Sequence, residues 1–187
     1  MKTVGLIVAT TPLVPYKNST ILEDSIRKLK RAEVELIVVV INSNKEQIES
    51  LLKNKEVEIV YHPTGSMNDI TSLVKAGLQK VFYIQDVEQS EELPFEALFI
   101  LSGDTPSLNT SVLVKEQLLM KYSDAKILYP TIQGKKKYPP LIRFNILQDI
   151  YDYAGEDGLK GALAQFESET AYMEVDEYDS TLEYETS

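Results

Sequence analysis

Apolar runs and amphipathic stretches alternate along this chain. Short runs made mostly of apolar residues predict buried strands at residues 4–9, 36–41, 58–61, 97–101, 126–129 and 171–175. Between these runs, apolar residues recur at helical spacing, which predicts helices over residues 20–31, 42 or 43 to about 53, 68 or 69 to 80, 110–122, 146–153 and 159–167. The segment 138–143 is expected to be extended, because its two prolines exclude a helix interior.

This order of elements predicts one domain over residues 1–187, with an acidic tail from about residue 176. The expected fold is a three-layer α/β/α sandwich around a mainly parallel sheet. The regular alternation stops after Tyr129, which indicates that one late strand runs antiparallel. Residues 85–96 are polar and acidic, and we expect a surface excursion there before the strand that begins at Ala97.

Composition and charge indicate an ordinary globular domain and argue against disulfide-linked, membrane-spanning and nucleic-acid-binding proteins. The 187 residues are 43% hydrophobic and 26% charged, which is ordinary for a globular domain. Without cysteine there is no disulfide, no thiolate nucleophile and no cysteine metal site. No apolar run is long enough to span a bilayer, and the first residues lack the layout of a signal peptide, so a cytoplasmic location is expected. The net charge of -10 opposes binding to nucleic acid or to an anionic membrane. A phosphorylated ligand would therefore have to be held by local groups.

The most informative segment is the apolar run 97–101 followed by Ser102-Gly103-Asp104-Thr105-Pro106. In open α/β sheets, ligands bind beyond the carboxyl ends of such buried strands. Asp104 is placed there and would suit a divalent metal held against phosphate oxygens. The alternative is that Asp104 only supports the turn before the next helix, since Gly-Asp-x-Pro is also favourable turn sequence.

The first strand ends in Thr10-Thr11-Pro12 instead of a glycine-rich loop. A phosphate cradle needs glycines so that several backbone N–H groups can approach the anion. Thr10 and Thr11 could still offer hydroxyl and amide donors, or they could form an ordinary turn. Lys17, a few residues later, could reach a phosphate or be a solvated surface lysine.

Three other polar segments have two interpretations each. His62, the single histidine, opens a loop with Gly65, Ser66 and Asn68, and a lone histidine is more often structural than catalytic. The basic segment 135–137 is either an anion-facing patch or a solvated hairpin tip. Asp157, just before a predicted helix, could orient a ligand group, but a helix cap is the favoured interpretation.

Several segments, in the same order, are similar to the motifs of one family. Residues 13–23 (LVPYKNSTILE) resemble L-L-P-x-x-G-x-x-L-L-E, and residues 65–78 resemble G-M-S-x-S-L-x-x-G-L. Residues 103–106 match G-D-x-P, 134–141 resemble G-x-x-G-H-P-V, 155–158 resemble G-D-x-G, and 179–183 faintly resemble the closing D-x-D-T-x-E-D. The chain thus resembles, over nearly its whole length, the MobA-like nucleotidyltransferases, which attach GMP or CMP to molybdopterin. Their fold is that of the nucleotide-diphospho-sugar transferases.

The resemblance implies transfer of a nucleotidyl group from CTP or GTP to a phosphorylated acceptor, with Mg²⁺ on Asp104. It implies catalytic roles for Asp104 and Lys17. The nucleotide side would be lined by Thr10, Thr11, Gly65, Asn68, Ser72 and Gly103, and the acceptor side by Tyr138, Pro140 and Asp157. The expected partners are the nucleotide and a phosphorylated small molecule, with a second copy of the chain or a maturation partner of molybdenum enzymes left open.

The departures from the family pattern give a second hypothesis. The opening signature A-A-G-x-S-x-R-M-G-x-x-K is missing, since Ala9-Thr10-Thr11 leads almost directly into residues 13–23. Tyr138-Pro139-Pro140 replaces G-H-P, so that histidine is absent as well. Phosphoryl transfer depends on positioned charge, and each well-aimed donor contributes about 3 kcal/mol to transition-state stabilisation. The alternative is therefore a catalytically inactive member with a degenerate site that acts as a ligand-binding or regulatory module.

Overall fold

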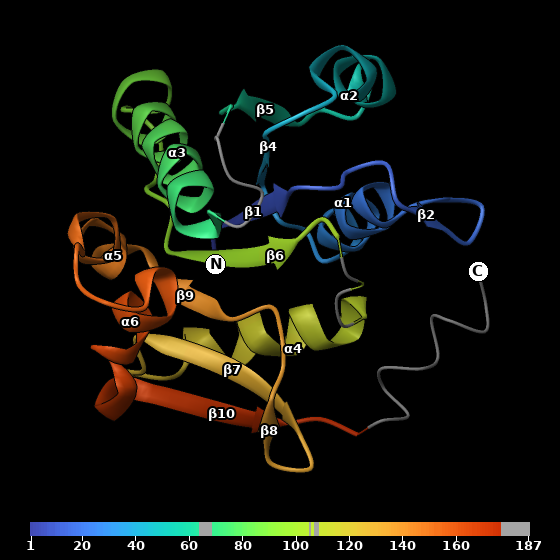
Figure 1. The fold of residues 1–187 in the computed structure, drawn as a ribbon. Coiled ribbons are helices and arrows are strands. Elements are labelled where there is room, and N and C mark those ends of the chain that lie inside the picture. The colour runs from blue at the N-terminus through green and yellow to red at the C-terminus, as the bar shows by residue number, and fades with distance from the viewer. Residues whose placement is uncertain (64–68, 105, 107–108, 177–187) are drawn as a thin grey trace.

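The computed structural model describes residues 1–63, 69–104, 106 and 109–176, and it confirms the predicted alternation of strands and helices (Figure 1). The strands are β1 (Thr3–Ala9), β2 (Pro15–Tyr16), β3 (Ser19–Thr20), β4 (Leu36–Ile41), β5 (Glu58–Tyr61), β6 (Ala97–Ser102), β7 (Ile127–Ile132), β8 (Lys135–Lys136), β9 (Leu141–Arg143) and β10 (Thr170–Glu174). The helices are α1 (Ile21–Arg31), α2 (Lys45–Leu52), α3 (Ile70–Tyr83), α4 (Thr110–Lys121), α5 (Leu147–Asp152) and α6 (Gly158–Ala164). No helix of this described part is both long and apolar enough to cross a membrane.

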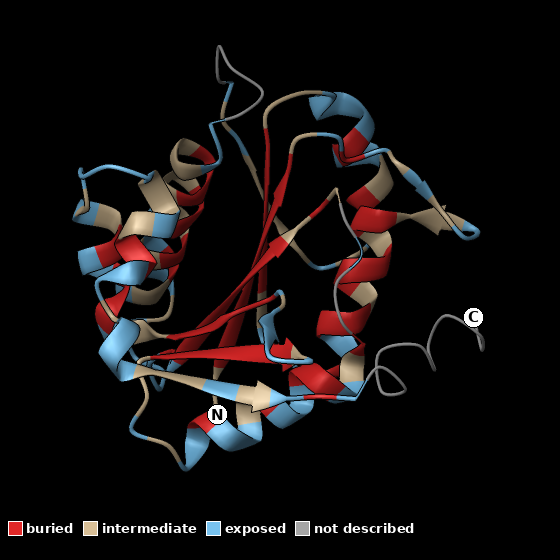
Figure 2. Cartoon of the chain, turned by 60° about the horizontal axis from the view of Figure 1, so that its bottom comes forward, coloured by how far each residue is buried: buried red, intermediate tan, exposed pale blue. Residues whose placement is uncertain are grey.

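The strands form a mixed, mainly parallel sheet in the order β10-β7-β9-β6-β1-β4-β5, with β8 paired to β7, while β2 and β3 form a separate hairpin. β9 is antiparallel to both β6 and β7, so it is the antiparallel strand predicted after Tyr129. Helices α3, α5 and α6 pack on one face of the sheet, and α1, α2 and α4 pack on the other (Figures 1 and 2). The predicted three-layer sandwich is therefore confirmed.

β1 shows why the central strands are almost purely apolar. Its side chains alternate between two cores: Val4, Leu6 and Val8 face α3, whereas Ile7 and Ala9 face α1. Because helices cover both faces, neither set of side chains meets solvent, and every residue of β1 is buried. Polar residues first become compatible with the fold where the strand leaves the sheet. The polar candidate residues that follow β1 and β6 therefore lie at the carboxyl edge of the sheet.

The sequence predicts side-chain caps at Ser19 or Thr20 for α1, at Asn42 or Ser43 for α2 and at Asn68 or Asp69 for α3, and the first and last of these are confirmed. At α1, the Thr20 hydroxyl accepts from the Glu23 N–H at 3.1 Å, and the Ser19 hydroxyl donates to the Glu23 carboxylate at 2.9 Å, a variant of the capping box. At α3, Asp69 accepts from the Ser72 N–H at 3.0 Å. The prediction for α2 is wrong. α2 begins at Lys45, two to three residues later than the predicted start, because Asn44 precedes it in a left-handed conformation that makes no side-chain cap.

Several predicted ends differ from the structure. β7 continues through Pro130 to Ile132, because the Pro130 carbonyl still accepts from the Lys137 N–H at 2.8 Å although proline donates nothing. α3 runs to Tyr83 and is extended by a π-helical turn, Ile84–Glu88. The two late helices are shorter than predicted, since 3-10 turns at Phe144–Ile146 and Glu167–Glu169 take their outer residues.

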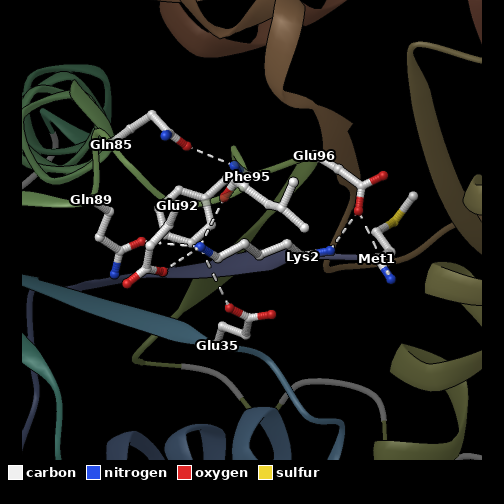
Figure 3. Close-up of polar contacts among 9 residues, drawn as sticks. Met1, Lys2, Glu35, Gln85, Gln89, Glu92, Phe95 and Glu96 are labelled. Atoms are coloured by element: carbon white, nitrogen blue, oxygen red, sulfur yellow. Dashed lines mark hydrogen bonds and ion pairs between the residues drawn. The ribbon is translucent and has the colours of Figure 1, made fainter.

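The expected surface excursion at 85–96 is anchored to the sheet by Lys2 (Figure 3). The Lys2 ammonium donates to the Glu92 carboxylate at 2.9 Å and lies 4.8 Å from the centroid of the Phe95 ring. The Lys2 backbone N–H donates to the Glu96 carboxylate at 2.7 Å. Phe95 itself is buried under this lysine. The segment therefore lies at the surface, as predicted, although Val87 and Leu93 are exposed there, and Lys2 attaches it to the start of β1.

Candidate functional site

The two central strands bring their carboxyl ends together at one edge of the sheet. β1 and β6 are parallel neighbours with Val8 opposite Ser102, and the Gly103 N–H donates to the Val8 carbonyl at 2.8 Å. The residues that follow the strands, Thr10 and Asp104, therefore lie side by side although they are far apart in the sequence. This edge is the ligand-binding edge of open α/β sheets.

Gly103 makes the close approach of the two chain segments possible. A Cβ built at this position would lie 2.5 Å from the Ala9 Cβ and 3.1 Å from the Ala9 Cα. The second atom belongs to the backbone of a buried strand, so a larger residue would push the turn away from β1. The predicted role of Gly103 beside the nucleotide is not tested by this contact, but its need for close packing is explained.

Asp104 accepts hydrogen bonds from the end of β1. Its Oδ2 accepts from both the N–H, at 3.2 Å, and the hydroxyl of Thr10, and its Oδ1 accepts from the Thr11 N–H at 2.7 Å. The Asp104 N–H donates to the Ser102 hydroxyl at 3.0 Å. The carboxylate is half-buried, and two consecutive backbone amides point at it. Thr10 and Thr11 thus donate to an internal anion.

These bonds leave Asp104 with limited but real capacity for a ligand. An ionised carboxylate has roughly four lone-pair positions, two on each oxygen. Thr10 uses both positions on Oδ2, whereas Thr11 uses one on Oδ1. Counting only partners among the described residues, one position on Oδ1 is left for a metal ion or a donor group. The carboxylate both supports the turn and keeps one acceptor site, so the two sequence interpretations of Asp104 are compatible.

A pocket of about 320 Å³ opens next to this turn. Most of its described lining is apolar: Val8, Ile70, Ile100, Leu101, Ser102, Pro106, Tyr138, Pro139 and Leu159. The lining comes from β1, β6, the turn after β6, the first residue of α3, the segment before β9 and the start of α6. Ser102 and Pro106 stand on either side of Asp104 in the sequence, which places the pocket against the turn that carries the carboxylate.

Ser72 lies in the first turn of α3, and its hydroxyl is 2.8 Å from His62 Nε2. His62 follows β5, and its N–H donates to the Ile41 carbonyl at 2.9 Å. The histidine therefore joins the end of the sheet to α3, in agreement with the structural interpretation favoured above. Gly65 and Asn68, the other candidates in this loop, lie outside the described residues.

The two basic candidates lie on hairpins. Lys17 sits in the turn between β2 and β3, which projects outward from the sheet in Figure 2, and its ammonium lies 5.6 Å from the centroid of the Tyr16 ring. Lys135 and Lys136 form β8 and pair antiparallel with β7. The basic segment therefore lies on a hairpin, and its role toward an anion stays a prediction.

The acceptor-side candidates are only partly brought together. Tyr138 lines the pocket and is 57% exposed. Pro139, and not the predicted Pro140, joins it there; Pro140 is buried, and its carbonyl accepts from the Ile100 N–H. Asp157 is exposed just before α6, but its side chain makes no capping hydrogen bond, so the cap interpretation is wrong. The backbone of Asp157 is left-handed, whereas a capping residue is normally extended, and this explains why its side chain does not cap α6.

Comparison with protein families identifies the family of this chain. A family model for the MobA-like NTP transferase domain matches residues 11–171. The chain belongs to this family. The matched range begins after β1 and includes β2 to β9, the Gly103-Asp104 turn and all of the described pocket lining except Val8. The predicted membership of the family is confirmed.

Solved structures show the same fold at low sequence identity. Rv0371c from Mycobacterium tuberculosis superimposes with a TM-score of 0.74 at 11% identity, covering 94% of this chain and 88% of that one, and it has also been solved in complex with manganese. A cytidylyltransferase from Leptospira borgpetersenii gives 0.65 at 16% identity, covering 94% and 76%. The 4-diphosphocytidyl-2C-methyl-D-erythritol synthase of Anaerococcus prevotii gives 0.66 at 14%, covering 96% and 89%. No curated protein matches the chain.

Sequence reasoning missed most of the pocket of this MobA-like domain. Ile70, Ile100 and Leu159 were assigned to helix and strand interiors, and nothing in their local pattern distinguishes a pocket wall from a core contact. Pro139 could have been found, because it stands where the family motif carries its histidine. Among the described residues, no group of three or more His, Cys, Asp or Glu could hold a metal ion.

Proposed function

We propose that this MobA-like domain binds CTP or GTP together with Mg²⁺ at Asp104 and transfers the nucleotidyl group to a phosphorylated acceptor. The observation that supports it is a half-buried carboxylate with one unused acceptor position, fixed at the carboxyl edge of β6 beside an open pocket. Molybdopterin as the acceptor follows from the family resemblance, as does a role in the maturation of molybdenum enzymes.

The donor set at Asp104 fits Mg²⁺. This ion is usually held by one or two carboxylates and completes its shell with water and substrate phosphate oxygens. One free position on Oδ1 is enough for such a contact. When bound, the ion would neutralise charge on the phosphate oxygens of the nucleotide. The manganese complex of Rv0371c supports the use of a divalent cation in this fold.

In this proposal Thr10 and Thr11 act as positioning residues. Their N–H and hydroxyl groups hold the Asp104 carboxylate in one orientation. Oδ2 accepts two of these hydrogen bonds and Oδ1 accepts one. A metal ion would then meet a preorganised ligand, which saves the entropy of ordering the side chain. The Ser102 hydroxyl accepts a hydrogen bond from the Asp104 N–H, which stabilises the turn.

A specific observation favours a second candidate, a non-catalytic ligand-binding or regulatory module. The backbone N–H groups of Thr10 and Thr11 are the first donors after β1, and both already donate to the Asp104 carboxylate. A triphosphate would therefore find none of the donors that a glycine-rich loop supplies. Without them, and without the arginine and lysine of the family signature, nucleotide binding could persist while turnover is lost.

Calorimetry with CTP and GTP, with and without Mg²⁺, tests the proposal. Asp104→Asn should abolish Mg²⁺-dependent binding, because the amide cannot replace a charged ligand to the ion. Asp124→Asn is the matched control, since it removes the same charge from an exposed position before β7. A transfer assay with labelled nucleotide and molybdopterin then separates the two candidates. Binding without transfer supports the module, and no heat with either nucleotide contradicts the proposed transferase and favours the module.

A further inference from the structure

The geometry points to an apolar group as the natural occupant of the pocket beside Asp104. We propose that the acceptor carries an aromatic ring or a branched hydrocarbon that enters this pocket, in preference to a sugar. The inference rests on the proposed function only for calling this molecule the acceptor. The preference for an apolar group stands on the pocket itself.

The pocket is too large to be a packing defect. Protein cores contain few voids larger than one water molecule, whereas ligand pockets begin at about 300 Å³. The pocket holds about 320 Å³. Its floor is made by Val8 and Ile100, which are 4% and 5% exposed. At its rim, Ile70 and Tyr138 are 41% and 57% exposed. Apolar side chains thus continue from the floor of the pocket to solvent.

The described lining offers few partners for a polar ligand. No Lys, Arg, His, Asp or Glu is among these residues. The Ser102 hydroxyl already accepts from the Asp104 N–H, which leaves it mainly its own proton to donate. A sugar would have to bury several hydroxyls, and each one left unpaired costs free energy. An apolar group instead gains from every square ångström that it removes from water.

The position of the pocket relates this preference to the proposed chemistry. Ser102 and Pro106 line it from the two sides of the turn that holds Asp104. A phosphate monoester with its organic group in the pocket would therefore carry its phosphate at the edge where the carboxylate stands. No new bond type is required, because the acceptor phosphate remains the nucleophile of the proposed transfer and pyrophosphate remains the leaving group.

The test compares two phosphate monoesters, 1-naphthyl phosphate and ribose 5-phosphate, by calorimetry in the presence of Mg²⁺ and without nucleotide. We expect 1-naphthyl phosphate to bind at least about tenfold more tightly, the scale of discrimination that small apolar differences provide. Ile70→Asn and Tyr138→Ala should each weaken it several-fold and leave ribose 5-phosphate unchanged. Both side chains are exposed enough for the variants to fold, which thermal melting verifies.

Matched controls are Leu118→Asn and Tyr122→Ala on and just after α4, whose side chains are 59% and 77% exposed and lie outside the pocket. They should change neither affinity. Equal affinity for the two probes, no binding of 1-naphthyl phosphate, or equal effects of pocket and control variants would each overturn the inference. A separate titration with CTP and GTP reports on the proposed function, so the failure of one can be told from the failure of the other.

Discussion

At the scale of single residues, the carboxylate of Asp104 is an internal anion for the backbone N–H groups that follow β1. Consecutive backbone amides at the end of a strand form a natural site for a negative group. In this chain the group is the protein's own carboxylate, held by Thr10 and Thr11. The first backbone N–H groups after β1 therefore have a hydrogen-bond acceptor within the protein. This explains how the turn after β1 can be stable without a bound ligand.

Removal of one donor should reveal the contribution of this arrangement. Thr10→Val removes the hydroxyl that donates to Asp104 but keeps the shape and the charge. Hydrogen bonds to charged groups contribute more than neutral ones, so we expect a loss of about 1–2 kcal/mol in the free energy of unfolding, measured in urea. Thr170→Val, which removes a 2.8 Å bond to the neutral Phe166 carbonyl, should cost about half as much. Equal losses would contradict the charge-assisted role.

Glu116 predicts a pH dependence. It lies on α4, is fully buried, and neither carboxylate oxygen has a hydrogen-bond partner in the described part of the chain. Burial raises the pKa of this carboxyl well above its usual range. Below the unfolded pKa, about 4.5, both states are protonated. As the pH rises from there toward the folded pKa, the unfolded state loses its proton first, so stability falls.

Glu116→Gln should remove this loss. The amide is similar in shape and has no charge to bury, so the variant should resemble the natural protein near pH 4 and exceed its free energy of unfolding by about 1–3 kcal/mol at pH 8. Urea unfolding at both values measures the difference. Glu46→Gln, at an exposed site in α2, serves as control and should give no pH-dependent gain. A gain that is equal at both pH values would contradict the role of ionisation.

At the scale of elements, the packing of the β6 turn against β1 defines the site. Gly103→Ala places a methyl group 2.5 Å from the Ala9 Cβ. Overpacking of this kind costs about 1–3 kcal/mol. We expect that loss in urea unfolding, together with weaker nucleotide binding, because the turn that carries Asp104 must move. Unchanged stability and binding would mean that the turn has room that the structure does not show.

The segment between α3 and β6 should depend on Lys2. Lys2→Met keeps the length of the side chain but removes the bonds to Glu92 and to the Leu93 carbonyl. Since the lysine side chain is only 12% exposed, we expect a loss of about 1–2 kcal/mol and faster hydrogen exchange over residues 85–95. Lys45→Met is the control, because its 4.0 Å pair with Glu49 is on the surface and should contribute little. Equal exchange in both variants would exclude the anchoring role.

At the scale of the whole molecule, the negative net charge should make nucleotide binding depend on a divalent cation. The chain carries -10 overall, and its described pocket lining contains no basic side chain. A nucleoside triphosphate should therefore bind only with a divalent ion. At about a hundredfold excess over its dissociation constant, CTP or GTP with Mg²⁺ should raise the melting temperature by about 5–10 °C. Chelation of the metal should abolish the shift. A shift that persists without metal would contradict binding through Asp104.

Local sequence patterns were enough to predict the layers of this protein and the edge of the sheet at which Asp104 lies. Apolar periodicity is a local property, so the interiors of β1, β4 and β6 and the start of α1 were predicted correctly. A carboxylate after a buried parallel strand must lie at the carboxyl edge, which predicted the place of Asp104. The element ends and the α2 cap were not predictable to the residue, because backbone conformations such as that of Asn44 are settled by packing.

Only the tertiary structure decided what Asp104 touches and what surrounds it. Its partners, Thr10 and Thr11, are more than 90 residues away in the sequence, and their meeting depends on the register of β1 against β6. The apolar pocket is likewise assembled from segments of six different elements or loops. Each of its residues has the pattern of an ordinary core position. Contacts of this kind carry no local signal, because they arise when distant segments are placed side by side by the sheet.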